Sequence, residues 1–168
     1  MQASMSEQFD SKQVFASLGK SVTVLAMKRD GERYASAATA VCNIADNPAS
    51  ILVCLKSDSS FGQRLLTTDN QPAMFSVNVL GAEQQNLLNH LMTSGSEDRF
   101  SLGDWQLSSE EVPFLADAAC SMQCQLIQHH QIDTHAVCIA RIVAANQGPD
   151  AGTIIFHNNT FHKIGSTS

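Results

Sequence analysis

A run of small residues is the first segment of this chain whose composition suits a nucleotide ligand. It reads Ser36-Ala37-Ala38-Thr39-Ala40-Val41. Small side chains let backbone N–H groups approach a planar ring or a phosphate, and Thr39 adds a hydroxyl group. The same run also fits a strand packed closely against a neighbouring strand. The residue types alone leave both interpretations open.

A cluster of hydroxyl side chains forms the second candidate, Lys56-Ser57-Asp58-Ser59-Ser60. It follows an apolar run and precedes an expected helix. Free N–H groups at a helix N-terminus favour an anion, and Lys56 adds a positive charge. Ser59 or Ser60 could instead simply cap the helix, and Asp58 argues against an anion. The cluster is a candidate phosphate site, with helix capping as the alternative.

Histidine, arginine and cysteine supply the remaining candidates. His135 opens a long apolar strand, a position from which a polar side chain often points into a cleft. Arg99-Phe100 could serve a cofactor through charge and stacking, or Phe100 could simply anchor a solvated loop to the core. No spacing among the six histidines and five cysteines indicates a metal site, and we expect none. The odd cysteine count predicts reduced thiols.

The elements that must position these residues are mostly strands. We expect a loop at residues 43–50 and irregular structure at 95–113. Helices are expected at residues 9–18, 59–68 and 82–92. Strands are expected at residues 21–28, 34–41, 51–56, 73–80, 120–128, 134–145, 153–157 and 160–164.

Hairpin signals connect these strands in pairs. Asp30-Gly31 and Asn158-Asn159 are both typical of tight turns. Paired strands favour an antiparallel barrel with peripheral helices over an alternating strand–helix fold. The sequence has no G-x-G-x-x-G or P-loop motif, so any nucleotide must bind without those devices.

Composition excludes several classes of function. The chain has 168 residues, 43% of them apolar, which fits one compact domain spanning residues 1–168. We expect residues 1–8 to be a disordered N-terminus. The net charge is −6 and no basic stripe is present, which disfavours binding to nucleic acid or to an anionic membrane. We see neither a secretory signal nor a membrane span and expect a cytoplasmic protein. Only 15% of residues are charged, which hints at a buried oligomer interface.

Several ordered blocks of the sequence resemble the short-chain flavin reductases, which are reductase components of two-component flavin monooxygenases. The longest block runs from Ala38 to Cys54 and is most similar to the reductase of 4-hydroxyphenylacetate 3-monooxygenase. Shorter blocks follow in the same order at residues 75–80, 97–102, 134–135 and 161–162. The resemblance covers residues 9–164, nearly the whole chain. It implies a mainly β fold, the antiparallel split β-barrel of the FMN-binding type, with peripheral helices.

The resemblance also implies roles for individual residues. Backbone groups of the small-residue segment would line the isoalloxazine ring, the Ser hydroxyls would bind phosphate, and the Arg-Phe pair would complete the site. His135 would lie beside the nicotinamide or the flavin edge and act in catalysis. The implied flavin-binding residues are Ala37, Ala38, Thr39, Ala40, Val41, Asn43, Pro48, Lys56, Ser57, Ser59, Ser60, Arg99, Phe100 and Phe161.

The implied activity is reduction of FMN or FAD by NADH or NADPH, in a homodimer that supplies reduced flavin to an oxygenase component. Two departures from the family pattern favour a different function. Ala35-Ser36-Ala37 replaces the usual Gly-Met/Ile-Thr, and Thr134 replaces the Asp that often precedes the late histidine. These departures suit a non-catalytic flavin- or haem-binding split barrel. A plain interaction domain with an empty cleft is the third alternative.

Overall fold

The computed structural model describes residues 5, 7–67, 72–95, 98–149 and 152–165. Strands dominate this part of the chain, which confirms the mainly β fold expected from the sequence. Its helices are α1 (Ser11–Ala16), α2 (Ser60–Leu65), α3 (Gln85–Thr93) and the 3-10 turn η1 (Asp98–Phe100). Its strands are β1 (Lys20–Ser21), β2 (Thr23–Arg29), β3 (Glu32–Ala38), β4 (Val41–Asp46), β5 (Ala49–Lys56), β6 (Met74–Val79), β7 (Trp105–Leu107), β8 (Pro113–Leu115), β9 (Cys120–Ile132), β10 (His135–Gln147), β11 (Thr153–His157) and β12 (Thr160–Ile164).

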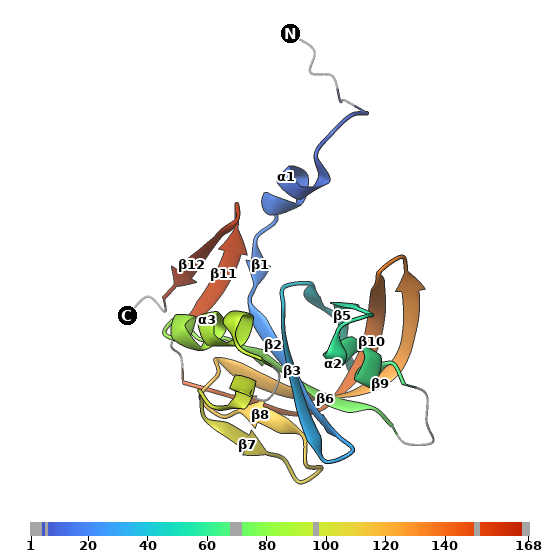
Figure 1. Ribbon diagram of the computed structural model, residues 1–168, viewed down its shortest axis with the longest axis vertical. Coiled ribbons are helices and arrows are strands. Elements are labelled where there is room, and N and C mark those ends of the chain that lie inside the picture. The colour runs from blue at the N-terminus through green and yellow to red at the C-terminus, as the bar shows by residue number, and fades with distance from the viewer. Residues whose placement is uncertain (1–4, 6, 68–71, 96–97, 150–151, 166–168) are drawn as a thin grey trace.

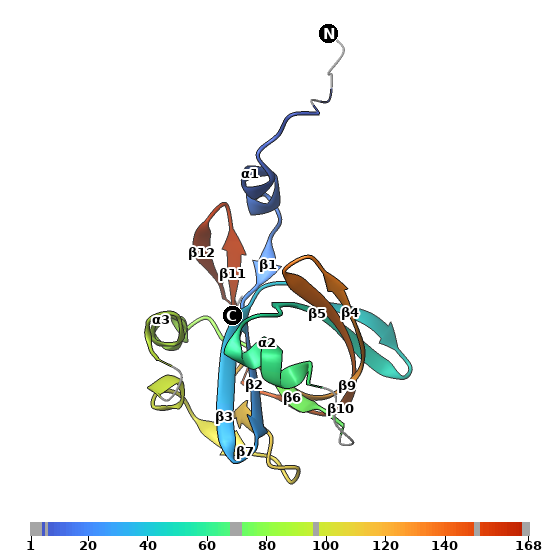
Figure 2. The same cartoon turned by 45° about the vertical axis from the view of Figure 1, so that its right-hand side comes forward.

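One large antiparallel sheet organises the fold. Its strand order is β3-β2-β6-β9-β10-β5-β4, so β3 and β4 are its two edges although they follow each other in the chain. The strands curl around a central core, as Figures 1 and 2 show from two sides. Two smaller sheets, β1-β11-β12 and β7-β8, accompany it. The curled sheet brings the residues that join β3 to β4 close to the end of β5.

Strand β2 separates two apolar clusters, because its side chains alternate between the faces of the sheet. Leu25 and Met27 pack into the first cluster, where Phe61 and Leu65 of α2 also lie. Val24 and Ala26 pack into the second cluster, beneath α3 and η1. Burial on both faces explains why residues 23–27 are continuously apolar apart from Thr23, whose hydroxyl has a hydrogen-bond partner.

Buried polar groups connect β6 to β8. The Asn78 side chain donates to the carbonyl oxygen of Val24 (2.9 Å) and accepts from the Leu115 amide (2.9 Å). Ser76 donates to the carbonyl oxygen of Pro113 at 2.6 Å. Satisfied buried bonds of this kind fix the relative position of the strands, because breaking one leaves a buried group unpaired.

The hairpin β9–β10 is the longest element of the sheet. Asp133 has a positive φ of 47° at its turn, and two register shifts interrupt the pairing. The turn lies further along the chain than the sequence indicates, since β9 runs to Ile132 and not to residue 128. His129 and His130 are exposed on β9.

The three-stranded sheet and α1 form one side of the molecule. Strand β1 pairs with β11, and α1 extends away from the body of the protein beyond them (Figure 1). Positive φ angles at Asn158 and Asn159 confirm the predicted hairpin between β11 and β12. Among the described residues, no helix is both long and apolar enough to cross a membrane.

Two regions differ from the expected pattern. Residues 43–50 were expected to be a loop, but β4 occupies Val41–Asp46 and pairs with β5 through a bulge between Asn43 and Ala45. Residues 95–113 were expected to be irregular, but they contain η1 and β7 and lead into β8. Both regions contain strands with exposed residues, and such strands form through cross-strand hydrogen bonds without a buried-face pattern in the sequence.

Candidate functional site

The small-residue segment lies where β3 ends and the chain crosses to β4. Ala37 and Ala38 end β3, Thr39 and Ala40 make the crossing, and Val41 opens β4. The Thr23 hydroxyl donates to the carbonyl oxygen of Ala38 at 2.8 Å. The Cys54 amide donates to the carbonyl oxygen of Ala40, also at 2.8 Å. The backbone is therefore held at both ends of the crossing.

Nothing bulky projects from this segment. The Ala37 and Ala40 side chains are exposed, and β3 is an edge strand. An edge strand presents backbone N–H and C=O groups that the sheet does not use. A planar ring can therefore approach the backbone closely, as the sequence suggested. Such an edge offers both hydrogen-bond donors and acceptors to a planar ligand.

The serine cluster forms the turn from β5 into α2. The Gly62 amide donates to Ser59 Oγ (2.9 Å), and Ser59 Oγ donates to the carbonyl oxygen of Lys56 (2.7 Å). Ser59 is thus the N-cap of α2, the alternative considered for this residue. The single hydroxyl proton of Ser59 is therefore already donated. The side chain of Ser60, in contrast, is exposed. Lys56 extends into solvent, and its Nζ lies 3.3 Å from Oδ1 of Asp58.

The end of hairpin β9–β10 lies against this turn. His135 and Lys56 are directly paired residues of β10 and β5. The Ser57 amide donates to the carbonyl oxygen of Thr134 at 3.0 Å, and Gln131 Nε2 donates to Ser57 Oγ at 2.7 Å. The imidazole of His135 is exposed, and its Nδ1 lies 2.9 Å from the hydroxyl oxygen of Thr134. The fold thus brings the predicted catalytic histidine to the predicted phosphate segment.

Both candidate segments lie at the same end of β5. Ala40 is hydrogen-bonded to Cys54, which precedes Lys56 by two residues. Two residues of a strand span about 7 Å, so the small-residue crossing and the Lys56–His135 pair are neighbours. Ala37–Val41, Lys56–Ser60 and His135 can therefore contact one ligand the size of a flavin nucleotide.

Arg99 reaches this region from η1. Its Nη1 donates to the carbonyl oxygen of Ala35 at 2.6 Å, on the edge strand just before Ala37. Its Nε is buried and has no hydrogen-bond partner among the described residues. Arg99 therefore contacts the backbone of β3 two residues before Ala37, where the small-residue segment begins.

Phe100 is part of the core. Its ring lies 4.7 Å from the Trp105 ring, and the Arg33 guanidinium lies 4.4 Å from the Phe100 ring centroid. With 9% of its surface exposed, Phe100 offers little area for stacking on a cofactor. Phe100 therefore anchors its loop to the core, which is the alternative that the sequence left open for this residue.

Three other predicted residues lie apart from this group. Asn43 is exposed within β4, and Pro48 is exposed in the β4–β5 turn at the far end of that hairpin. Phe161 lies on β12, where its ring packs 5.0 Å from that of Phe156. Within one chain, Phe161 belongs to the second apolar cluster and not to the surface around Ala40.

Sequence reasoning missed Gln131 and Arg33. Gln131 binds Ser57 across a gap of 74 residues, and Arg33 covers one face of Phe100. Both contacts arise only from the tertiary arrangement. The polar pair Asp133-Thr134, at the turn between β9 and β10, is the sequence signal that places Gln131 near His135.

Two cavities among the described residues do not contain the predicted residues. One, of about 630 Å³, lies between the β2–β3 turn and β9, with Lys28, Asp30 and Glu111 on its wall. The other, of about 280 Å³, lies between β7–β8 and the far half of β10. We take the open surface around Ala40 as the candidate site because the chemically suitable groups converge there, and the volume of a hollow does not by itself indicate chemistry.

The buried thiols are unsuited to nucleophilic chemistry. All five cysteines are free, as predicted. Burial raises the pKa of Cys124 to about 12 and the pKa of Cys138 to about 11. A thiol is nucleophilic as its thiolate, so these two groups are inert near neutral pH.

Comparison with known proteins gives the family directly. Residues 15–165 match the model of the flavin reductase like domain. This chain belongs to the flavin reductase family. The match spans nearly all of the described structure, including every residue of the candidate site.

Known members resemble this flavin reductase-like chain in sequence and structure. The chain is 30% identical to an FMN reductase (NADH), RutF, of Agrobacterium fabrum, over 98% of this chain and 94% of that protein. The NADH:FAD oxidoreductase SgcE6 of Streptomyces globisporus C-1027, solved with NAD and FAD fragments, has 24% identity and a TM-score of 0.83 over 97% of this chain and 99% of that one. The styrene monooxygenase flavin reductase of Pseudomonas putida S12 has 20% identity and a TM-score of 0.79 over 95% of this chain and 100% of that one.

Proposed function

We propose that this chain is an NAD(P)H-dependent flavin reductase that reduces FMN or FAD. The observation that carries the proposal is the convergence of the accessible small-residue crossing, the Lys56–Ser57 turn and His135 at one end of β5. Its membership of the flavin reductase family and the NADH-dependent activity named for its relatives support the proposal.

Different residues of the site bind different parts of the flavin. Backbone groups of Ala37–Val41 bind the ring, and Lys56, Ser57 and Ser60 bind the phosphate. Ser59 supports these groups by capping α2, and Phe100 supports them from the core. Asn43, Pro48 and Phe161 extend the site beyond the surface that one chain assembles around Ala40.

Catalysis requires positioning more than acid or base strength. When bound, the flavin supplies the chemistry by accepting at N5 a hydride from nicotinamide C4. The protein holds the two rings in contact, which makes the transfer effectively unimolecular. His135 orients the nicotinamide or exchanges a proton at the ring edge through its exposed imidazole. Its Nδ1 is kept in place by the Thr134 hydroxyl.

The outer face of the sheet suits a second copy of the chain. Leu52 and Ile139 are directly paired on β5 and β10, and both are only half-buried. Val137 continues this strip on β10, and Ile44 of β4 is exposed at 47%. We infer a cytoplasmic homodimer that covers this strip and brings residues of one subunit towards the open site of the other. Light scattering during size-exclusion chromatography tests the oligomeric state.

The open site suits a flavin that binds as a substrate and dissociates after its reduction. A surface without a lid among the described residues allows rapid release, which a reductase needs when it hands reduced flavin to another protein. A relative of the same fold is the reductase of a styrene monooxygenase. We therefore propose an oxygenase component as the recipient of the reduced flavin.

One assay decides the central claim. The oxidation of NADH and of NADPH is followed by nicotinamide absorbance, with and without FMN, FAD or riboflavin. Flavin-dependent oxidation with either nucleotide supports the proposal. A purified protein that carries flavin or haem but oxidises neither nucleotide would instead be a non-catalytic binding protein.

A further inference from the structure

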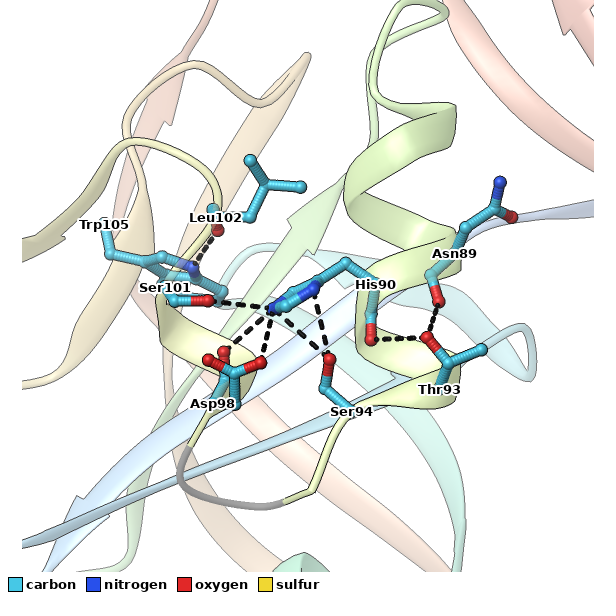
Figure 3. Close-up of polar contacts among 8 residues, drawn as sticks. All are labelled: Asn89, His90, Thr93, Ser94, Asp98, Ser101, Leu102 and Trp105. Carbon is cyan, nitrogen blue, oxygen red and sulfur yellow. Dashed lines mark hydrogen bonds and ion pairs between the residues drawn. The ribbon is translucent and has the colours of Figure 1, made fainter.

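His90 forms a polar cluster that joins the end of α3 to η1 (Figure 3). Its side chain is 21% exposed and contacts Ser94, Asp98 and Ser101. Asp98 and Ser101 immediately flank Arg99-Phe100 in the chain. One imidazole therefore holds both sides of the turn that carries Arg99.

The hydrogen-bond distances indicate which ring nitrogen of His90 carries a proton. Nε2 lies 2.8 Å from the carbonyl oxygen of Asp98, which can only accept, so Nε2 carries a proton. In the neutral ring, Nδ1 then accepts from the Ser94 hydroxyl at 3.1 Å. The Ser101 hydroxyl lies 3.1 Å from Nε2, and the Asp98 carboxylate lies 3.8 Å from it. An apolar side chain of similar size would fill the same space without any of these bonds.

The turn held by His90 acts on the edge strand β3. Arg99 extends from η1 and donates to the carbonyl oxygen of Ala35 at 2.6 Å. Ala35 pairs with Ala26 of β2 on its other side. Edge strands lack a neighbouring strand to hold their outer groups, so a side-chain donor there restricts the strand directly. The small-residue segment begins two residues later, at Ala37.

We propose that His90 is a positioning residue for flavin binding. Through η1 and Arg99, it holds β3 in the conformation that presents Ala37–Val41 to the flavin ring. This inference rests on the proposed function, because it concerns the same flavin site. His90 contacts neither flavin nor nicotinamide, so its effect falls on flavin affinity and not on the hydride-transfer step.

The primary test compares His90→Leu with His90→Gln. Leucine removes the hydrogen bonds, whereas glutamine keeps an N–H donor for the Asp98 carbonyl oxygen and so restores part of the function. We expect His90→Leu to raise the dissociation constant and KM for flavin roughly 5- to 10-fold, the range for one or two lost hydrogen bonds, while kcat changes less than about 2-fold. Quenching of flavin fluorescence measures affinity independently of activity. Asn89→Ala is the matched control, an exposed residue of α3 whose side chain accepts a hydrogen bond from Gln85 within the helix.

A double variant tests the route through Arg99. If His90 acts by holding Arg99, the affinity loss of His90→Leu combined with Arg99→Ala equals that of Arg99→Ala alone. Additive losses would overturn the proposed route. Amide hydrogen exchange of β3, measured without flavin, should be faster in His90→Leu than in wild type.

The remaining outcomes separate this inference from the proposed function. A His90→Leu protein that unfolds at a lower temperature but binds flavin as tightly as wild type has lost a structural contact only, and this overturns the inference alone. A wild-type protein that neither binds nor reduces flavin overturns the proposed function, and the inference falls with it.

Discussion

His135 and Lys56 lie directly opposite each other on neighbouring strands, at the point where β10 begins and β5 ends. Their side chains therefore emerge from one edge of the site although 79 positions separate them in the sequence. The proposed function assigns Lys56 to the phosphate of the flavin and His135 to the nicotinamide or the flavin edge. We therefore expect both ligands to contact this edge of the site.

Replacing His135 should slow turnover more than it weakens flavin binding. We expect His135→Ala to lower kcat roughly 100-fold, the lower range for loss of a group that assists proton movement, with a change in flavin affinity of about 2-fold or less. Steady-state kinetics and fluorescence titration measure the two effects. His130→Ala, an exposed histidine of the same hairpin, is the control. Equal losses of turnover and affinity would contradict the catalytic role of His135.

Lys56 should distinguish flavins with a phosphate from those without one. Lys56→Gln removes the charge and leaves a polar side chain that is one atom shorter. Since Lys56 is exposed, we expect a modest rise of about 3- to 5-fold in KM for FMN, as for a partly screened ion pair. Riboflavin lacks the phosphate and is the internal control, and its KM should not change. An equal rise in KM for FMN and for riboflavin would show that Lys56 does not act through the phosphate.

Gly62 allows the turn before α2 to pack tightly. A Cβ atom at this position would overlap the carbonyl oxygen of Lys56, a backbone group that cannot easily move. We expect Gly62→Ala to lower the free energy of unfolding by about 2–3 kcal/mol through overpacking. Urea denaturation measures this loss. Gly95→Ala is the control because nothing lies within 4 Å of its added Cβ, and equal stability of the two variants would refute the prediction.

The buried thiols should make stability fall at alkaline pH. The pKa of Cys124 is raised from 9.0 to about 12 and that of Cys138 from 9.0 to about 11, mainly by burial. Above pH 9.0 the unfolded chain ionises these thiols while the folded protein keeps them protonated, so the unfolded state binds fewer protons. Stability is then lost as pH rises from 9.0 towards the folded pKa values, at up to about 1.4 kcal/mol per pH unit for each thiol.

Urea denaturation on either side of pH 9.0 checks this effect. Cys138→Ala should lose stability less steeply with pH than wild type, and Cys42→Ala, at an exposed position, should keep the wild-type slope. Identical slopes in all three proteins would show that the buried thiols do not contribute.

The buried strands and the tight turns were predictable from the sequence. The apolar run at residues 51–55 lies in β5, where Ile51, Val53 and Leu55 are buried, and Asp30-Gly31 has the positive φ angles of a tight turn. Local chemistry determines these features, because a buried strand face needs apolar side chains and positive φ favours Asp, Asn and Gly. The neighbouring β4 was missed because its exposed residues show no buried face.

The candidate site was predictable only in part. Resemblance to a family placed the small-residue segment, the serine cluster and His135, which the fold brings together. It could not show that the Ser59 hydroxyl is taken up by helix capping, or that Arg33 and Trp105 cover Phe100. The Arg33–Phe100 contact joins residues far apart in the chain, and residue type alone does not determine whether Ser59 caps the helix or faces a ligand.

The hydrogen bond from Arg99 to Ala35 also bears on solubility. An unpaired strand edge is a template on which another chain can add a strand and begin to aggregate. Arg99 occupies one acceptor of β3, and the Arg33 side chain adds charge on the same strand. Two arginines at this edge therefore disfavour the addition of a neighbouring backbone, while the exposed Ala37 leaves room for the flat ligand that we propose.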